Sequence, residues 1–281
     1  MEGLSALLVA LLLVVMAAVV RWRRRVPRGT VGEIAAEDAP ALPAQDPPQL
    51  AWLTAEQQAR WQRQVQRFLL EKRFIGCAGL VVGEHHRRTI AGMACLLRVQ
   101  PNAEAQSLFP TVREVLVYPD AFLVPSAPQP VSEYGLELVD DAPDERIGEH
   151  GPGQVVLSWA DVEAALAGDA VQVVLHEFAH ALDSENPETE GAPPMADYRE
   201  WSAVMGAEFA RLQRHRRPPV LDPYGATAPG EFWCVVVEAF FQQPTALARH
   251  HPGLFRLLAE YFELNPPLTD ASPLAPPGSA A

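Results

Sequence analysis

The residues that most clearly predict chemistry read His-Glu-Phe-Ala-His, from His176 to His180. Positions four apart lie on one face of a helix, so the two histidines can bind one tetrahedral metal ion. Glu177 lies beside them and can take a proton from a water molecule whose pKa the metal lowers. The pattern therefore predicts a zinc site for peptide hydrolysis, with Glu177 as general base. The alternative is a surface helix that carries a histidine pair and no metal.

A catalytic zinc ion needs a third protein ligand, and two downstream carboxylates could supply it. Glu231 follows Pro229 and Gly230, so it falls in the first turn of a predicted helix, where a carboxylate can also simply stabilise the helix dipole. Glu238 comes seven residues later on the same face, in an apolar stretch where an unpaired carboxylate is costly. It needs a hydrogen-bond partner such as a metal-binding histidine, or it is itself the ligand.

Asp183 is a further candidate, because it follows His180 by three residues. Its carboxylate can orient a metal-binding imidazole from the second shell of the site. It can equally cap the end of the helix that carries the two histidines. The sequence leaves both roles open.

The elements that must position these side chains are mostly helices. The apolar turn before His176 predicts a buried helix over 171–182, and the two downstream carboxylates lie on a predicted helix over 231–241. Thr54 and Gln57 form a capping box before another apolar stripe. The remaining predicted elements are helices at 88–99, 161–166, 197–214 and 254–264 and strands at 115–118 and 154–159. The fold class is therefore α+β, mostly helical with a small sheet.

The N-terminus predicts a membrane anchor. Residues 3–20 form an uncharged apolar run of 18 residues, which spans roughly 27 Å as a helix and can cross a bilayer. Four arginines follow within 21–25, whereas a cleaved signal peptide carries its positive charge before the apolar run. The positive-inside rule then places the rest of the chain in the cytoplasm, at the inner membrane.

The chain divides into four expected parts. Residues 1–25 form the transmembrane anchor, and the proline-rich residues 26–50 predict a solvated linker. The peptidase domain is expected over 51–265. Residues 266–281 are rich in Pro, Ser and Ala and predict a disordered tail.

The composition limits the kinds of partner. The chain has 281 residues and a net charge of −13, and an acidic body argues against direct binding of nucleic acid. The three cysteines, Cys77, Cys95 and Cys234, show no CxxC spacing, which excludes a zinc site of the cysteine type. We expect them to be buried thiols, and we expect His85 and His86 to form a solvated helix start.

Several segments together resemble the Mlc titration factor A family of zinc-dependent peptidases, which is related to the catalytic domain of anthrax lethal factor. The segments are HEFAHALD at 176–183, LSW at 157–159, FIGCAGL at 74–80 and the stretch from Tyr224 to Glu238. The resemblance covers roughly 55–265 and implies a zincin-like metallopeptidase fold with one zinc ion. It also implies that the strand at 155–158 is the edge strand beside the active-site helix, able to pair with an extended peptide.

The resemblance decides between the two candidate carboxylates. In the family, the third zinc ligand is a glutamate seven residues after a tyrosine that assists catalysis. Glu231 follows Tyr224 at this spacing, which gives the ligand set of a gluzincin with His176 and His180. Tyr224 would then point its hydroxyl at the oxyanion of the tetrahedral intermediate. Glu238 becomes a second-shell partner of a histidine.

The family also implies two functions from different classes. One is aminopeptidase-like cleavage of small peptides. The other is a regulatory binding module that sequesters a transcriptional repressor such as an Mlc-like protein, with weak or no peptidase activity. The predicted anchor and linker depart from the best-known members of the family, which are soluble.

Overall fold

The computed structural model describes residues 46–101, 107–124, 144–146, 148–151, 153–168, 172–195, 197–214 and 219–268. All of them belong to one compact unit, Leu42–Ala281. The predicted anchor, most of the predicted linker and most of the predicted tail lie outside these residues. In the described part of the chain, no helix is long and apolar enough to span a bilayer.

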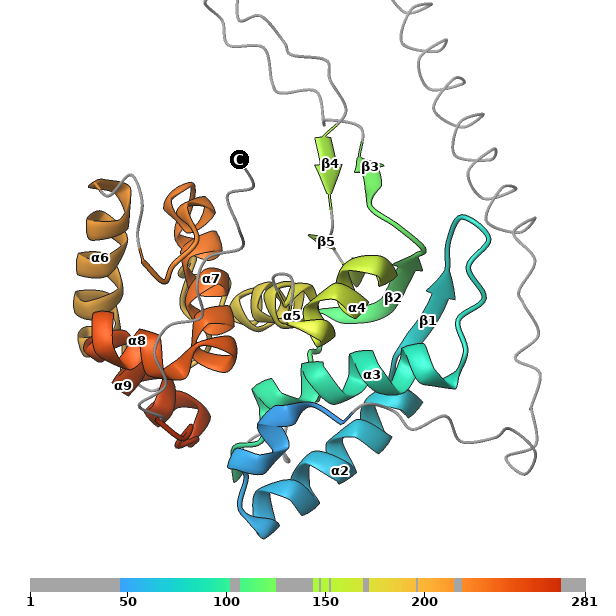
Figure 1. Cartoon of the computed structure of the whole chain (residues 1–281), viewed down its shortest axis with the longest axis horizontal. Helices are drawn as coiled ribbons and strands as arrows, with labels where there is room; N and C mark the ends of the chain where they lie inside the picture. Colours follow the sequence, from blue (N-terminus) through green and yellow to red (C-terminus); the bar gives the residue numbers. More distant parts are fainter. Residues whose placement is uncertain are drawn as a thin grey trace, which may run out of the picture. The chain divides into compact units, whose positions relative to one another are not determined.

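Helices dominate the described residues (Figure 1). In chain order, the elements are η1 Pro48–Trp52, α2 Ala55–Glu71, β1 Arg73–Gly76, α3 Glu84–Cys95, η2 Leu96–Arg98, β2 Val112–Tyr118, β3 Phe122–Val124, β4 Asp144–Arg146, β5 Gly148–Gly151, β6 Gly153–Ser158, α4 Trp159–Ala167, α5 Val173–Asp183, α6 Arg199–Arg214, η4 Pro223–Ala226, α7 Pro229–Gln242, α8 Pro244–His250 and α9 Pro252–Phe262. A mostly helical α+β fold with a small sheet is thus confirmed.

The main sheet has the order β1-β2-β6-β5. Strands β1, β2 and β6 are parallel, and β5 pairs antiparallel with β6, so that Val155 of β6 lies between Val115 and His150. The prediction that 155–158 is an edge strand is therefore wrong, because β6 is paired on both sides. The edge strand beside α5 is β5, whose four residues include two glycines and show no apolar alternation in the sequence.

Helix α2 forms as the capping box predicts. The hydroxyl of Thr54 accepts from the backbone N–H of Gln57, and the side chain of Gln57 accepts from the backbone N–H of Thr54. The helix buries an apolar stripe that includes Trp61, Val65 and Phe68. This stripe packs on α3 and extends the core beneath the sheet.

The folded body begins before residue 51, where the sequence analysis placed its start. Gln49 is buried in η1 and its side-chain amide donates to the carbonyl of Phe241 at 3.1 Å. Trp52 stacks on the ring of the same residue at a centroid distance of 6.2 Å. The end of the proline-rich segment is therefore part of the core, because both contacts fasten it to the end of α7.

Helix α3 begins four residues earlier than expected, and two histidines in its first turn are partly buried. The imidazole of His86 caps the helix by accepting from the backbone N–H of Gly83 at 3.0 Å. The rings of His85 and His86 are half-buried against Trp159, at centroid distances of 5.4 and 4.4 Å. The two histidines are thus less exposed than predicted, because Trp159 comes from a distant part of the chain, whereas Gly83 and Glu84 at the start of the helix are exposed.

Helices α5 and α7 are the elements that place the predicted site. Helix α5 lies between α7 on one side and the sheet with α4 on the other (Figure 1). The indole N–H of Trp233 on α7 donates to the carbonyl of Ala179 on α5 at 2.9 Å, and both residues are buried. The two helices are therefore joined inside the core by packing and by a directional hydrogen bond.

Candidate metal centre

Helix α5 presents the two histidines of the predicted motif on one face. The rings of His176 and His180 lie one turn apart, with centroids separated by 4.9 Å. The first turn of α5 is buried, as its apolar residues Val173, Val174 and Leu175 predict. The side chains of the motif are thus held by a helix that cannot slide without disrupting the core.

Glu231 brings a carboxylate to both imidazoles from the first turn of α7. Its Oε2 atom lies 3.2 Å from Nε2 of His176 and 3.3 Å from Nε2 of His180. A tetrahedral ion with bonds of 2.0–2.1 Å would hold its ligand atoms about 3.3–3.4 Å apart. Two imidazole nitrogens and one carboxylate oxygen at these separations fit a single zinc ion.

Glu238 contacts the opposite nitrogen of the first histidine. Its Oε1 atom lies 2.5 Å from Nδ1 of His176. Because Nδ1 faces this carboxylate, Nε2 is the nitrogen that faces Glu231 and a metal ion. The contact is the one expected of a carboxylate that orients a metal-binding imidazole, and it gives this buried residue its hydrogen-bond partner.

His176, Glu231 and Glu238 shift one another's pKa values. Burial lowers the pKa of His176, but hydrogen bonds to Glu231 and Glu238 outweigh burial and raise it to about 10. Burial raises the pKa of Glu231, but its hydrogen bonds to His176 and His180 outweigh this effect and lower the pKa. Burial raises the pKa of Glu238, against the effect of His176. The carboxylates therefore create a negative potential that favours a cation between the helices.

Cys234 is a second possible third ligand that the sequence analysis did not place at the site. Among the residues that the structure describes, donor atoms of His176, His180 and Cys234 lie within 4.8 Å of one another. Burial raises the pKa of the Cys234 thiol well above its ordinary value, and nearby carboxylates raise it further. A cysteine binds metal as a thiolate, whereas the Glu231 carboxylate has an oxygen 3.2 and 3.3 Å from the two imidazole nitrogens, separations that suit ligands of one tetrahedral ion. The three-residue spacing from Glu231 is the signal that could have found Cys234.

The two predicted catalytic residues differ in how far they are exposed to solvent. Glu177 on α5 is 4% exposed. Tyr224 in η4 is 53% exposed, and its ring centroid lies 6.3 Å from that of His176. The side chain of Asp222 accepts from the backbone N–H of Tyr224 at 2.8 Å, and a Cβ at Gly225 would lie 3.2 Å from Val235 of α7. The segment that carries Tyr224 is therefore fixed at the rim of the site.

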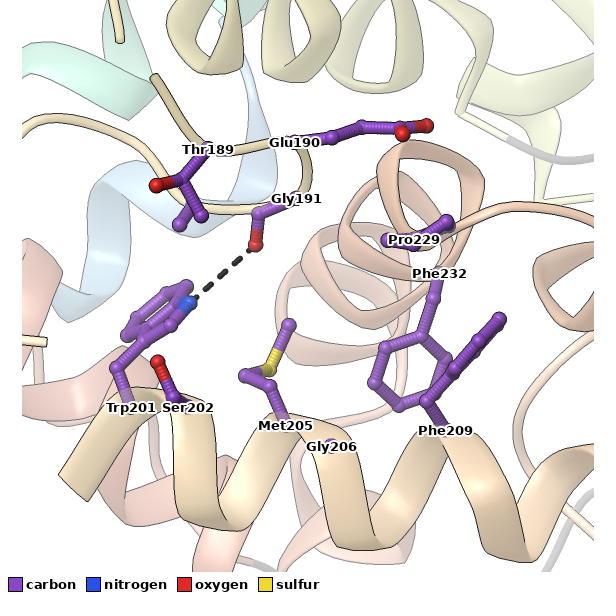
Figure 2. Close-up of a pocket in the computed structure, with 11 residues that line it drawn as sticks. Thr189, Glu190, Gly191, Trp201, Ser202, Met205, Gly206, Phe209, Pro229 and Phe232 are labelled. Carbon is purple, nitrogen blue, oxygen red and sulfur yellow. Dashed lines mark hydrogen bonds between the residues drawn. The ribbon is translucent and has the colours of Figure 1, made fainter. Parts of the chain in front are cut away.

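Asp183 contacts the loop that follows α5. Its Oδ1 atom accepts from the backbone N–H of Ala192 at 2.7 Å. Beside this loop lies a pocket of about 200 Å³ (Figure 2), lined by Thr189, Glu190, Gly191, Ala192, Trp201, Ser202, Met205, Gly206, Phe209, Pro229 and Phe232. The pocket borders the start of α7, two residues before Glu231, on the flank formed by α6 and the loop.

Comparison with known proteins defines the class of this protein. Residues 20–263 match the model of the glucose-regulated metallopeptidase M90 family. The chain belongs to this family of metallopeptidases, and the family implies a metal.

Within this class, the chain is related to the Mlc titration factor A proteins. The protein of that name from Escherichia fergusonii is 29% identical over 256 residues, which cover 84% of this chain and 91% of the relative. Its counterpart from Klebsiella pneumoniae subsp. pneumoniae is 29% identical over 231 residues, covering 78% and 83%. An uncharacterized protein of Synechocystis sp. is 34% identical over 229 residues, covering 78% and 81%. The resemblance inferred from the sequence motifs is thus confirmed.

Proposed function

We propose that this protein is a zinc-dependent peptidase of the gluzincin type, in which His176, His180 and Glu231 bind one zinc ion. The observation that carries the proposal is the position of the Glu231 carboxylate, 3.2 and 3.3 Å from the two imidazole nitrogens. These separations suit ligands of one tetrahedral ion. Membership of a metallopeptidase family supports the same conclusion.

The side chains around the site divide the work of hydrolysis. Bound zinc supplies a Lewis acid and a water of lowered pKa. Glu177 takes the proton of the attacking water and delivers it to the leaving amine. The hydroxyl of Tyr224 donates to the oxyanion of the tetrahedral intermediate. Glu238 holds Nδ1 of His176 and thereby keeps the imidazole in one orientation.

The peptide substrate would lie along β5. This strand is the edge of the main sheet and lies beside α5. An edge strand can pair through its free backbone groups with an extended peptide, which brings the scissile bond past the active-site helix. Aminopeptidase-like cleavage of small peptides is the mode that the family resemblance favours.

The substitution Glu177→Gln tests the proposed function. It removes the general base while leaving every proposed metal ligand in place, so hydrolysis should fall about 10²- to 10⁴-fold and zinc content should stay at one ion per chain. Glu188→Gln is the matched control, because Glu188 is an exposed residue beyond the end of α5. The measurements are hydrolysis of a chromogenic amino-acid and peptide panel and metal analysis. Full activity in Glu177→Gln would contradict the mechanism.

A regulatory binding function is the second candidate, and the names of the Mlc titration factor A relatives favour it. In this case the protein would sequester an Mlc-like repressor, and hydrolysis would be weak or absent. Capture of purified repressor by the wild type and by a His176→Ala/His180→Ala double variant distinguishes the two functions. If both the capture and the cellular phenotype survive the double substitution, binding is the main function.

We also propose that residues 1–25 anchor the enzyme in the inner membrane with the catalytic domain in the cytoplasm. The support is the uncharged run at 3–20 followed by four arginines. Phosphatase and fluorescent-protein fusions at position 30 test the orientation. Phosphatase activity at that position would place the catalytic domain on the outer side and exclude a cytoplasmic repressor as partner.

A further inference from the structure

The loop between α5 and α6 returns to the start of α7. We propose that residues 189–192, which we call the clamp loop, position Glu231 for metal binding by fixing the first turn of α7. This inference rests on the proposed function, because it assigns a role toward the same metal site. It adds positioning residues that touch neither the metal nor the peptide.

Gly191 of the clamp loop lies close to the backbone of Pro229 in the first turn of α7. A Cβ at Gly191 would lie 2.6 Å from the carbonyl oxygen of Pro229 and 2.9 Å from its carbonyl carbon. Gly191 also has a φ of +76°, a backbone conformation that glycine adopts without strain. The clamp loop thus lies against the backbone two residues before Glu231, at a distance that any larger side chain would prevent.

Hydrogen bonds from two helices hold the clamp loop in this place. Asp183, at the end of α5, accepts from the backbone N–H of Ala192 at 2.7 Å. The indole of Trp201 on α6 donates to the carbonyl of Gly191 at 3.2 Å (Figure 2). Because Asp183 lies three residues after His180, these contacts connect the histidine helix directly to the loop.

A further hydrogen bond joins the clamp loop to α7. The carboxylate of Glu190 accepts from the backbone N–H of Gly230 at 3.4 Å. This N–H belongs to the first turn of the helix, where backbone donors lack partners within the helix and a negative charge is favourable. Gly230 is the residue directly before Glu231, so the contact restrains the backbone that carries the ligand.

The pocket beside the clamp loop explains why such restraint is needed. Gly191, Pro229 and Phe232 line a space of about 200 Å³. A helix turn that borders unfilled space can shift more easily than one surrounded by packed side chains. The next part of α7 is fixed by Trp233 in the core, and the clamp loop extends this fixation to the turn that carries Glu231.

The substitution Gly191→Ala tests the inference in the full-length chain. The added methyl group must push the loop and Pro229 apart, so we expect zinc affinity to fall about 10- to 100-fold, as for other outer-shell changes. The measurement is competition for zinc with a chromophoric chelator, alongside thermal unfolding of the metal-free protein. These readouts do not depend on hydrolytic activity.

Two matched controls separate positioning from general destabilisation. Gly168→Ala places a methyl group at a φ of +86°, and Gly206→Ala adds one to the wall of the same pocket. At both positions, a Cβ meets nothing within 4 Å. Both controls should bind zinc within about threefold of the wild type, even if Gly168→Ala unfolds at a lower temperature.

Asp183 provides an independent variant pair, which decides the matter if Gly191→Ala does not fold. Asp183→Ala removes the acceptor of the Ala192 N–H and should weaken zinc binding, whereas Asp183→Asn keeps an acceptor oxygen and should restore most of it. If the Gly191→Ala and Asp183→Ala proteins fold and bind zinc as tightly as the wild type, the role of the clamp loop is overturned and the proposed function is unaffected. A wild-type protein that binds no zinc would overturn the proposed function as well.

Discussion

Two regions of α7 carry the two carboxylates that reach His176, and the regions differ in how they are held. Glu238 lies in the middle of the helix, where its side chain is 8% exposed, and it contacts Nδ1. Glu231 lies in the first turn, where its side chain is 21% exposed, and it faces the Nε2 atoms of both histidines. The same residue type can therefore orient a ligand in one place and be a ligand in the other.

The difference follows from position along the helix. The middle of α7 is fixed by the core, so a carboxylate there is suited to hold one imidazole in one orientation. The first turn emerges from the core beside a pocket and is fixed by a loop from outside the helix. A carboxylate there has an open side from which an ion and a substrate can approach.

The largest expected effect comes from removing the first-turn carboxylate. Glu231→Ala should weaken zinc binding by well over the 100-fold that outer-shell changes reach, because a ligand itself is lost. The matched control is Cys234→Ala, which removes the other possible donor on α7 and should leave zinc affinity within about tenfold. Chelator competition measures both, and the reverse order of effects would assign the third ligand to Cys234.

A smaller effect is expected at the middle of the helix. Glu238→Gln keeps the size and an acceptor oxygen but removes the carboxylate charge that strengthens the hydrogen bond to Nδ1 of His176 and makes this imidazole a better metal donor. Zinc affinity should fall about 10-fold, the lower end of the range for outer-shell partners. If Glu238→Gln costs as much as Glu231→Ala under the same titration, the two carboxylates do not have different roles.

The smallest effect on the metal is expected from the hydrogen bond that joins the two helices. Trp233→Phe removes the donor to the carbonyl of Ala179 and should lower the free energy of unfolding by about 1–3 kcal/mol. Zinc affinity should change less than threefold, because the clamp loop still fixes the first turn. Chemical denaturation and chelator competition check the two values, and a large loss of affinity would show that the core, rather than the loop, positions Glu231.

The sequence predicted those parts of the site that depend on local spacing. His176 and His180 are four residues apart, and Glu231 and Glu238 are seven apart, so each pair lies on one helix face. In the structure, the two carboxylates from α7 both contact a histidine of α5. The capping box at Thr54 likewise fixed the start of α2. Helical periodicity is a strong local signal, so these parts required no knowledge of distant contacts.

The parts that could not be predicted depend on contacts between distant segments. The edge position of β5 depends on pairing with β6, and four residues with two glycines carry no strand signal. Strand β1 and helix α8 were missed because short elements have weak periodicity. Nothing local indicates that Gly191 lies against Pro229, since a glycine in a loop is equally consistent with an ordinary turn.

The most direct test of the account is the X-ray absorption spectrum of zinc bound to the full-length protein. We expect one zinc ion per chain with nitrogen and oxygen ligands at about 2.0–2.1 Å and no sulfur in its coordination shell. A zinc–sulfur distance of about 2.3 Å would assign the third ligand to Cys234 in place of Glu231. Either that distance or a protein without bound zinc would contradict the central claim.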